Sequence, residues 1–323
     1  MRLPKFDYRR PESIQEASTI LLEDPSARVL SGGTDLLVNM KYKVERPSTI
    51  VSLKSLSELN YVRQANGTLR IGALTPLKIV YNDTFVAQKL PALAIAAASV
   101  GSYHHQIMGT IGGNLCQQTR CKYFNQSKWW RSSRETCFKA GGDMCHVAKK
   151  EHVCYSTYCG DVAPALLVLN AEVVLTGKGG SKQVPLESIF SGEGKTPLKL
   201  EPGEILTEIF IPEQAADGFS TYKKFANRES IDFPIVGAAF WTSRTSQESR
   251  VALTAVDRKP LRARQLEDFM KGKRLGDEVI EAVDGLVAKE TRLMMSSTDS
   301  ISLKRQLMGR LVKAAIREAM GGI

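Results

Sequence analysis

Six cysteines are the residues of this sequence whose type and spacing most plainly indicate chemistry. All of them lie between positions 116 and 159, with gaps of C-x4-C-x15-C-x7-C-x8-C-x4-C. Clustered thiols in a reducing compartment favour metal binding over disulfides. The absence of CxxC argues against a zinc ribbon and against a thioredoxin-type dithiol. Spacing alone leaves a [4Fe–4S] cluster and a four-cysteine zinc site equally open. The cysteines are Cys116, Cys121, Cys137, Cys145, Cys154 and Cys159.

The segment 119–157 that contains most of these thiols has no clear helical or strand periodicity. It is rich in Lys, Arg, Ser and Gly. A stretch of about 40 residues without an apolar core needs another interaction to hold it in one conformation. Metal binding can supply that interaction, so we expect an irregular loop fastened by a metal site.

Two glycine motifs indicate a second kind of site. Residues 31–36 (SGGTDL) separate an apolar strand pattern from a helix pattern, and residues 109–114 (GTIGGN) join a helix to irregular backbone. Two glycines allow positive φ angles and expose N–H groups, and a helix start adds a positive dipole end. The first motif can therefore cradle an anion such as a pyrophosphate, although a plain strand-to-helix turn has the same pattern. Neither motif is GxGxxG or GxxxxGK[ST]. Two such loops on separate units suggest a large extended ligand such as FAD.

Other chemistry is weakly indicated. The four histidines, His104, His105, His146 and His152, are more typical of solvated or capping roles than of metal ligands. No Ser/His/Asp arrangement or carboxylate pair stands out, so we assign no catalytic residue.

The periodicity of the segments around the cysteines and the glycine motifs predicts an α+β fold. Residues 14–23 have the pattern of an amphipathic helix, and 235–243 and 250–256 that of paired strands. Residues 262–322 are predicted mainly helical, with an apolar packing stripe. We expect units at 1–55, at 56–216 with an insert at about 119–157, and at 217–323. The stripe is Leu307, Met308, Leu311, Val312, Ala315 and Ile316.

Composition excludes several classes. The chain has 323 residues and a net charge of +10, with 43% hydrophobic and 24% charged residues. No apolar run approaches membrane-spanning length, and the N-terminus lacks a secretory apolar core, so we expect a cytoplasmic protein without membrane contact. The basic charge is typical of a solvated surface or of docking to an acidic partner. Nucleic acid is not expected, because zinc-finger spacing and RNP-like motifs are missing.

Six short motifs together indicate a family. They are SGGTDLL, LRIGALTPL, GTIGGNL, GDVAPALLVLNAEV, EILTEIFIP and YKKFANR. In this order and spacing the chain resembles the FAD-binding subunit of the molybdenum hydroxylases, the xanthine dehydrogenase group. The resemblance covers essentially the whole chain. It implies a two-part FAD-binding domain made of the first two units, followed by a C-terminal sheet-plus-helices domain.

The insert at about 119–157 indicates which members of the family the chain resembles most. About 40 residues separate GGNLCQ from GDVAPAL, where most family members run on directly. The segment NLCQQTRCKYFNQSKWWR is similar in sequence to the β subunit of 4-hydroxybenzoyl-CoA reductase, whose insert carries a [4Fe–4S] cluster. A related insert occurs in flavin subunits of some bacterial aldehyde oxidoreductases. The resemblance implies four cluster ligands and leaves Cys116 and Cys159 as structural thiols. The implied ligands are Cys121, Cys137, Cys145 and Cys154.

The resemblance also implies FAD contacts. The first loop would wrap the pyrophosphate and ribose, the second would line the flavin and phosphate region, and Asp161 would hydrogen-bond the flavin. The family's Asn-x-Glu/Asp turn appears here as Gly33-Thr34-Asp35. The implied residues are Val29, Leu30, Ser31, Gly32, Gly33, Thr34, Asp35, Leu36, Val100, Thr110, Gly113, Asn114, Asp161, Leu206 and Lys224.

The implied function is electron transfer. FAD and the cluster would pass electrons from a ferredoxin-like carrier to a [2Fe–2S] subunit and a molybdopterin-binding subunit, in a heterotrimer that dimerises. The complex would convert 4-hydroxybenzoyl-CoA to benzoyl-CoA. The alternatives are a subunit of an aldehyde or purine hydroxylase, with electrons flowing the other way, and a non-redox module with a four-cysteine zinc site.

Overall fold

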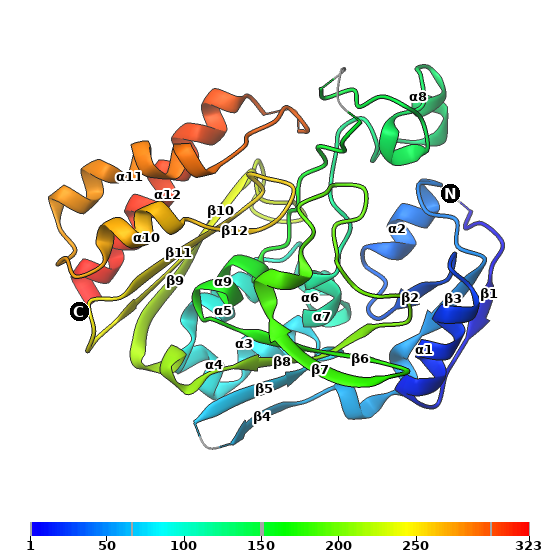
Figure 1. The fold of residues 1–323 in the computed structure, drawn as a ribbon, viewed down its shortest axis with the longest axis horizontal. Helices are drawn as coiled ribbons and strands as arrows, with labels where there is room; N and C mark the ends of the chain where they lie inside the picture. The colour runs from blue at the N-terminus through cyan, green and yellow to red at the C-terminus, as the bar shows by residue number, and fades with distance from the viewer. Residues whose placement is uncertain (1, 66, 149–151, 298, 323) are drawn as a thin grey trace.

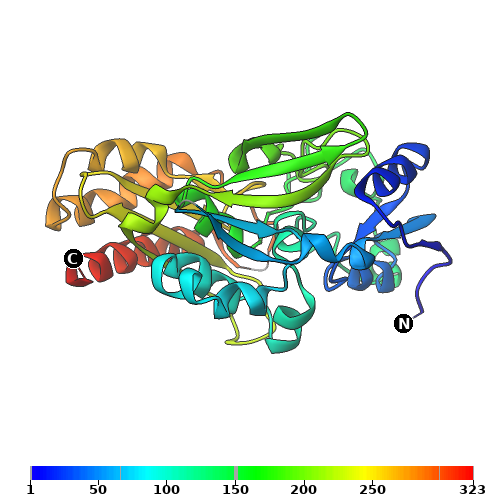
Figure 2. The ribbon, with the colours of Figure 1, turned by 90° about the horizontal axis from the view of Figure 1, so that it is seen from below.

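The computed structural model describes residues 2–65, 67–148, 152–297 and 299–322. Three sheets form three units along the molecule. Figures 1 and 2 both show the N-terminal unit and the C-terminal unit at opposite ends, with the middle unit between them. The predicted α+β fold is confirmed, while the exact unit boundaries stay predictions.

The N-terminal unit is a small parallel sheet with strand order β1-β3-β2 and two helices. The first helix begins as a capped amphipathic segment, because the Ser13 hydroxyl accepts from the backbone N–H of Glu16 at 3.1 Å. The expected strand, glycine turn and helix around the first motif are present. The elements are β1 (Asp7–Arg9), α1 (Ile14–Glu23), β2 (Arg28–Leu30), α2 (Leu36–Lys41) and β3 (Thr49–Ser52).

The middle unit is built on an antiparallel sheet with strand order β4-β5-β8-β6-β7. Helix α9 is buried along its whole length, as its apolar sequence requires, and belongs to the largest core cluster. The strands are β4 (Val62–Ala65), β5 (Thr68–Gly72), β6 (Glu172–Gly177), β7 (Gly180–Pro185) and β8 (Ile205–Ile211). The helices are α3 (Leu77–Asn82), α4 (Thr84–Lys89), α5 (Pro91–Ala98), α6 (Tyr103–Met108), α7 (Ile111–Leu115) and α9 (Val162–Val168).

The C-terminal unit is an antiparallel sheet of order β12-β11-β10-β9. Helices α10 to α12 lie along the sheet (Figure 1), and the predicted stripe on α12 packs into the core of this unit. The predicted pairing of the two apolar strands is confirmed as β10 against β11. The elements are β9 (Gly218–Phe225), β10 (Val236–Ser243), β11 (Ser249–Thr254), β12 (Leu261–Arg262), α10 (Arg264–Met270), α11 (Asp277–Glu290) and α12 (Ile301–Gly322).

The insert projects from the body near α2 (Figure 1). It is largely irregular, as expected, with one short helix, α8 (Lys128–Ser132), and a 3-10 turn at Phe138–Ala140. Its base is closed by two backbone hydrogen bonds between Arg120 and Thr157, of 2.7 and 2.8 Å. A further backbone bond of 2.7 Å from Lys122 to Ser296 ties the insert to the segment before α12.

One local expectation was wrong. The second glycine motif does not lead into irregular backbone but starts helix α7, which Thr110 caps through its hydroxyl. Cys116 is the residue that ends this short helix. In the described part of the chain we find no helix of the length and apolarity that a bilayer crossing requires.

Candidate functional site

A large cavity lies where the N-terminal and middle units meet. Its volume is about 760 Å³, within the range of pockets that hold cofactors. Both glycine motifs contribute to its wall, together with β8 and the segment that leads into the insert. It is lined by every predicted cofactor-binding residue except Lys224: Val29, Leu30, Ser31, Gly32, Gly33, Thr34, Asp35, Leu36, Val100, Thr110, Gly113, Asn114, Asp161 and Leu206.

The two glycine loops pack directly against each other. A Cβ atom on Gly32 would lie 2.0 Å from the carbonyl oxygen of Met108, so only glycine fits there. Gly33 has φ +77°, whereas Gly32 is not in the left-handed region. The prediction of a positive φ angle is therefore confirmed for Gly33 and wrong for Gly32. At Gly32 the missing side chain instead allows the backbone of Met108 to come close. Side chains join the loops too, because the Thr110 hydroxyl donates to the Ser31 hydroxyl at 3.2 Å.

Glycines in α7 let this short helix sit deep in the structure. A Cβ on Gly112 would lie 2.7 Å from the Cβ of Ala73, and one on Gly113 would lie 2.8 Å from the Ser31 hydroxyl oxygen. The Thr110 hydroxyl accepts from the N–H of Gly113 at 3.1 Å. The Asn114 side-chain oxygen accepts from the N–H of Val162 at 3.3 Å, which joins α7 to α9.

Asp161 is a buried carboxylate in the cavity wall, held by two side chains from β9. The Tyr222 hydroxyl donates to it at 2.8 Å, and the Lys224 ammonium lies 3.2 Å away. Burial raises the pKa of Asp161 to about 6, and the Lys224 charge and the Tyr222 hydrogen bond oppose this increase. Lys224 also donates to the carbonyls of Ser99 and Asp232. Lys224 thus stands behind Asp161 and does not line the cavity.

Asp35 is linked to the base of the insert. Its carboxylate accepts from the Arg120 guanidinium, from the N–H of Gln118 at 3.1 Å and from the Asn39 amide at 3.2 Å. Gln118 and Arg120 both line the cavity. Neither residue was predicted from the sequence, because a glutamine and an arginine within a polar, basic insert carry no periodic signal.

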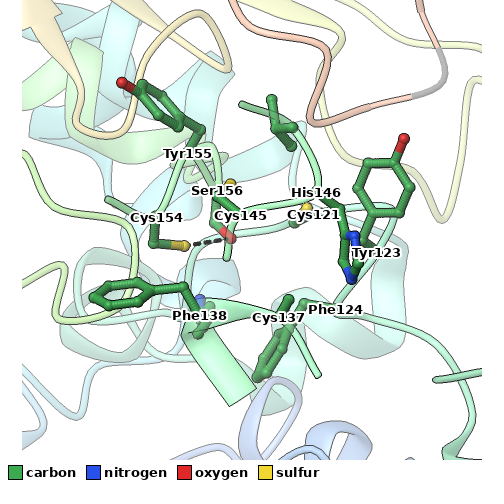
Figure 3. A pocket seen from close by; sticks show the side chains of 12 residues that line it. Cys121, Tyr123, Phe124, Cys137, Phe138, Cys145, His146, Cys154, Tyr155 and Ser156 are labelled. Carbon is green, nitrogen blue, oxygen red and sulfur yellow. Dashed lines mark hydrogen bonds between the residues drawn. The ribbon is translucent and has the colours of Figure 1, made fainter. Parts of the chain in front are cut away.

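A second, much smaller pocket lies inside the insert (Figure 3). Its volume is about 10 Å³, and the four predicted ligands, Cys121, Cys137, Cys145 and Cys154, all line it. Aromatic side chains from the same loop surround the thiols. Cys116 and Cys159 line the large cavity instead. Within the described ranges, no three or more His, Cys, Asp or Glu side chains are arranged as a ready-made site for a metal ion.

Three thiols of the small pocket, those of Cys121, Cys145 and Cys154, are buried, and the thiol of Cys137 is partly buried. Burial raises the pKa of Cys121 to about 11 and also raises that of Cys154. The Cys154 thiol donates to the Ser156 hydroxyl at 3.2 Å, and its N–H donates to the Glu193 carboxylate at 3.0 Å. Lys139 is held nearby through the Thr119 hydroxyl at 2.6 Å. Metal binding would have to displace the thiol protons.

Two histidines lie at these pockets and have local partners. His105 lines the large cavity and bonds the Ser102 hydroxyl at 2.8 Å. His146 lines the small pocket and bonds the Glu135 carbonyl at 2.8 Å.

Comparisons with known proteins decide the family. Residues 4–214 match the family described as "FAD binding domain in molybdopterin dehydrogenase". Residues 220–319 match "CO dehydrogenase flavoprotein C-terminal domain". The chain belongs to the FAD-binding subunits of the molybdenum hydroxylase family.

Relatives of this FAD-binding subunit align over most of its length. The nicotinate dehydrogenase FAD-subunit of Eubacterium barkeri is 28% identical over 93% of this chain and 91% of that protein. The aldehyde oxidoreductase FAD-binding subunit of Escherichia coli K12 is 30% identical over 80% of this chain and 83% of that protein. A structure of carbon monoxide dehydrogenase from Hydrogenophaga pseudoflava has a TM-score of 0.80 at 25% identity, over 99% of both chains.

Asp161 gives this flavin subunit a measurable pH dependence. Its folded pKa lies above the unfolded value, so the folded state binds the proton more tightly. The free energy of unfolding of the FAD-free chain should therefore fall as pH rises from about 4 through about 6, by roughly 1 to 3 kcal/mol. Asp161→Asn should abolish this fall. Urea unfolding of both proteins at about pH 4.5 and about pH 7.5 measures it, and equal pH dependence would refute the assignment.

Proposed function

We propose that this flavin subunit carries FAD and a [4Fe–4S] cluster and transfers electrons within a multi-subunit molybdenum oxidoreductase. Substrate chemistry would take place on another subunit. The observation that carries the proposal is the placement of the short segment 118–121. Gln118 and Arg120 line the large cavity, while Cys121, the next residue, lines the thiol pocket. Two cofactors bound in these pockets would therefore be joined by a few bonds of one chain segment.

The residues around the large cavity suit FAD. Two glycine-containing loops offer backbone approach without side chains in the way, and the volume accommodates an extended ligand. The residues proposed to hold it are the fourteen predicted lining residues, with Lys224 acting through Asp161. FAD supplies the redox chemistry, and the chain binds, orients and shields it.

The donor set of the small pocket suits a cubane cluster in type and number, because [4Fe–4S] clusters take four cysteine thiolates. Phe124, Phe138 and Tyr155 also line this pocket and would limit water access. The volume of this pocket, about 10 Å³, has room for about one water molecule. Cluster assembly would therefore open the pocket by turning the thiols or shifting the insert. The large irregular share of the insert makes such an adjustment feasible.

For the substrate, we propose reductive dehydroxylation of 4-hydroxybenzoyl-CoA. Two electrons and two protons would convert it to benzoyl-CoA and water on the molybdopterin-binding subunit, by way of a [2Fe–2S] subunit. A ferredoxin-like carrier would supply the electrons. The insert suits an acidic carrier, since residues 119–157 contain eight Lys and Arg but three Asp and Glu. Trp129, on α8, is 81% exposed and adds an apolar contact point.

The identity to an aldehyde oxidoreductase subunit favours a second candidate, an aldehyde or purine hydroxylase. In that case electrons would flow from the molybdenum subunit to the flavin. The same FAD and cluster proposals apply to both candidates, so the substrate assay separates them.

Cys137→Ser should remove the cluster and leave the flavin bound. Serine is a poorer ligand than thiolate, and Cys137 lines the thiol pocket but not the FAD cavity. In the anaerobically purified chain, iron should fall from four per chain to nearly none, while FAD content changes by less than about twofold.

Cys159→Ser is the matched control, because Cys159 belongs to the same group of six cysteines but lies outside the thiol pocket. It should keep its iron. Equal iron in the Cys137 variant and the wild type would overturn the ligand set. A colourless protein that retains zinc would establish the non-redox alternative.

The assembled complex should consume 4-hydroxybenzoyl-CoA with a reduced low-potential dye and release benzoyl-CoA. The dye bypasses the natural carrier, so the measurement depends only on the complex. Turnover of aldehydes or purines with an electron acceptor, without reductase activity, would instead support the second candidate.

A further inference from the structure

We propose that Arg120, assisted by Gln118, binds the diphosphate and adjoining sugar of FAD. Neither residue belongs to a glycine motif, and both come from the start of the insert. The inference rests on the proposed FAD site and adds a binding residue to it. It also makes one residue of the insert a cofactor contact while its neighbour, Cys121, is a proposed cluster ligand.

Charge balance in the cavity calls for a cation. Among the described residues that line it, acidic side chains outnumber basic ones and there is no lysine. Arg28 is drawn toward Glu45 at 3.6 Å and is 45% exposed, so water screens it. The Arg120 side chain is only 17% exposed. A diphosphate carries negative charge that must be paired when it leaves water. The ionisable lining residues are Arg28, Asp35, Glu45, His105, Arg120, Asp161, Glu204 and Asp232.

Two buried polar atoms at this position lack partners. The Nε atom of Arg120 and the Oε1 atom of Gln118 are shielded from water, and neither has a hydrogen-bond partner among the described residues. Unpaired buried polar groups are unfavourable, and both side chains line the cavity, so a ligand that reached these atoms after a small rotation of either side chain would supply the missing partners. Nε is a donor, as a phosphate oxygen requires. Oε1 is an acceptor, as a sugar hydroxyl requires. The pair therefore matches a phosphorylated sugar.

Neighbouring side chains anchor Arg120 beside the cavity. Its Nη atoms donate to Asn39, at 3.1 Å, and to Asp35, which leaves Nε. Its guanidinium lies 4.6 Å from the ring centre of Phe233, and its backbone pairs with Thr157. The same cation neutralises Asp35, whose carboxylate would otherwise repel a phosphate in this wall. A prepositioned arginine loses little entropy when it binds.

The test compares FAD and riboflavin binding to the deflavinated full-length chain. In Arg120→Gln, the FAD dissociation constant should rise at least about tenfold, since a charge-assisted hydrogen bond to phosphate is lost. Riboflavin, which has no phosphate, should bind as in the wild type. Arg120→Lys keeps the charge and should recover part of the FAD affinity. Flavin fluorescence quenching measures all three. Raised salt should weaken FAD binding less in Arg120→Gln than in the wild type.

Arg134→Gln is the matched control, because Arg134 is an exposed cation of the same insert that stacks on Trp130. It should leave FAD binding unchanged. Unchanged FAD affinity in Arg120→Gln would overturn the inference. An equal loss of FAD and riboflavin affinity would also overturn it, since Arg120 would then act only on the fold. If the wild type bound no FAD, the proposed function itself would fail.

Discussion

Close backbone packing at Gly32 is the constraint on which the cavity depends. The Met108 carbonyl occupies the space that any side chain at this position would fill. This contact presses the turn after β2 against the segment that begins α7, although the two are far apart in sequence. Because the chain leaves α7 and soon enters the insert, the same contact fixes where the insert begins. The position of the thiol pocket thus follows from a contact in the FAD cavity wall.

The base of the insert is fixed to the rest of the molecule by several contacts. Backbone pairing of Arg120 with Thr157 brings the two ends of the insert together, and the Asp35 carboxylate fastens one of them to the N-terminal unit. The bond between Lys122 and Ser296 adds an anchor in the C-terminal unit. All three units therefore meet at the base of the insert. This anchoring of the base of the insert suits electron transfer, because cofactors bound on either side of it would be held at a fixed separation.

Elements with strong periodicity were predictable from the sequence, and short elements set by tertiary contacts were not. The α12 stripe appears in the structure as expected because burial on one face dictates the residue pattern. Strand β10 pairs with β11 as expected, and it is buried on both faces between two core clusters. Helix α7 was missed because Gly112 and Gly113 disfavour helix, and only the Thr110 cap and close packing hold it. Arg120 was missed because its partner Asp35 is 85 positions away. The division of six cysteines into four and two came from resemblance, since spacing does not encode it.

Cofactor content of the anaerobically purified wild-type chain tests the central claim most directly. Flavin released by acid, iron and acid-labile sulfide would be counted against protein, and an absorption spectrum would be recorded on the same sample. The account predicts one FAD, four irons and four sulfides per chain, with flavin bands above a broad iron–sulfur shoulder. One FAD without iron would contradict the two-cofactor account, and a protein without flavin would contradict the proposed function as a whole.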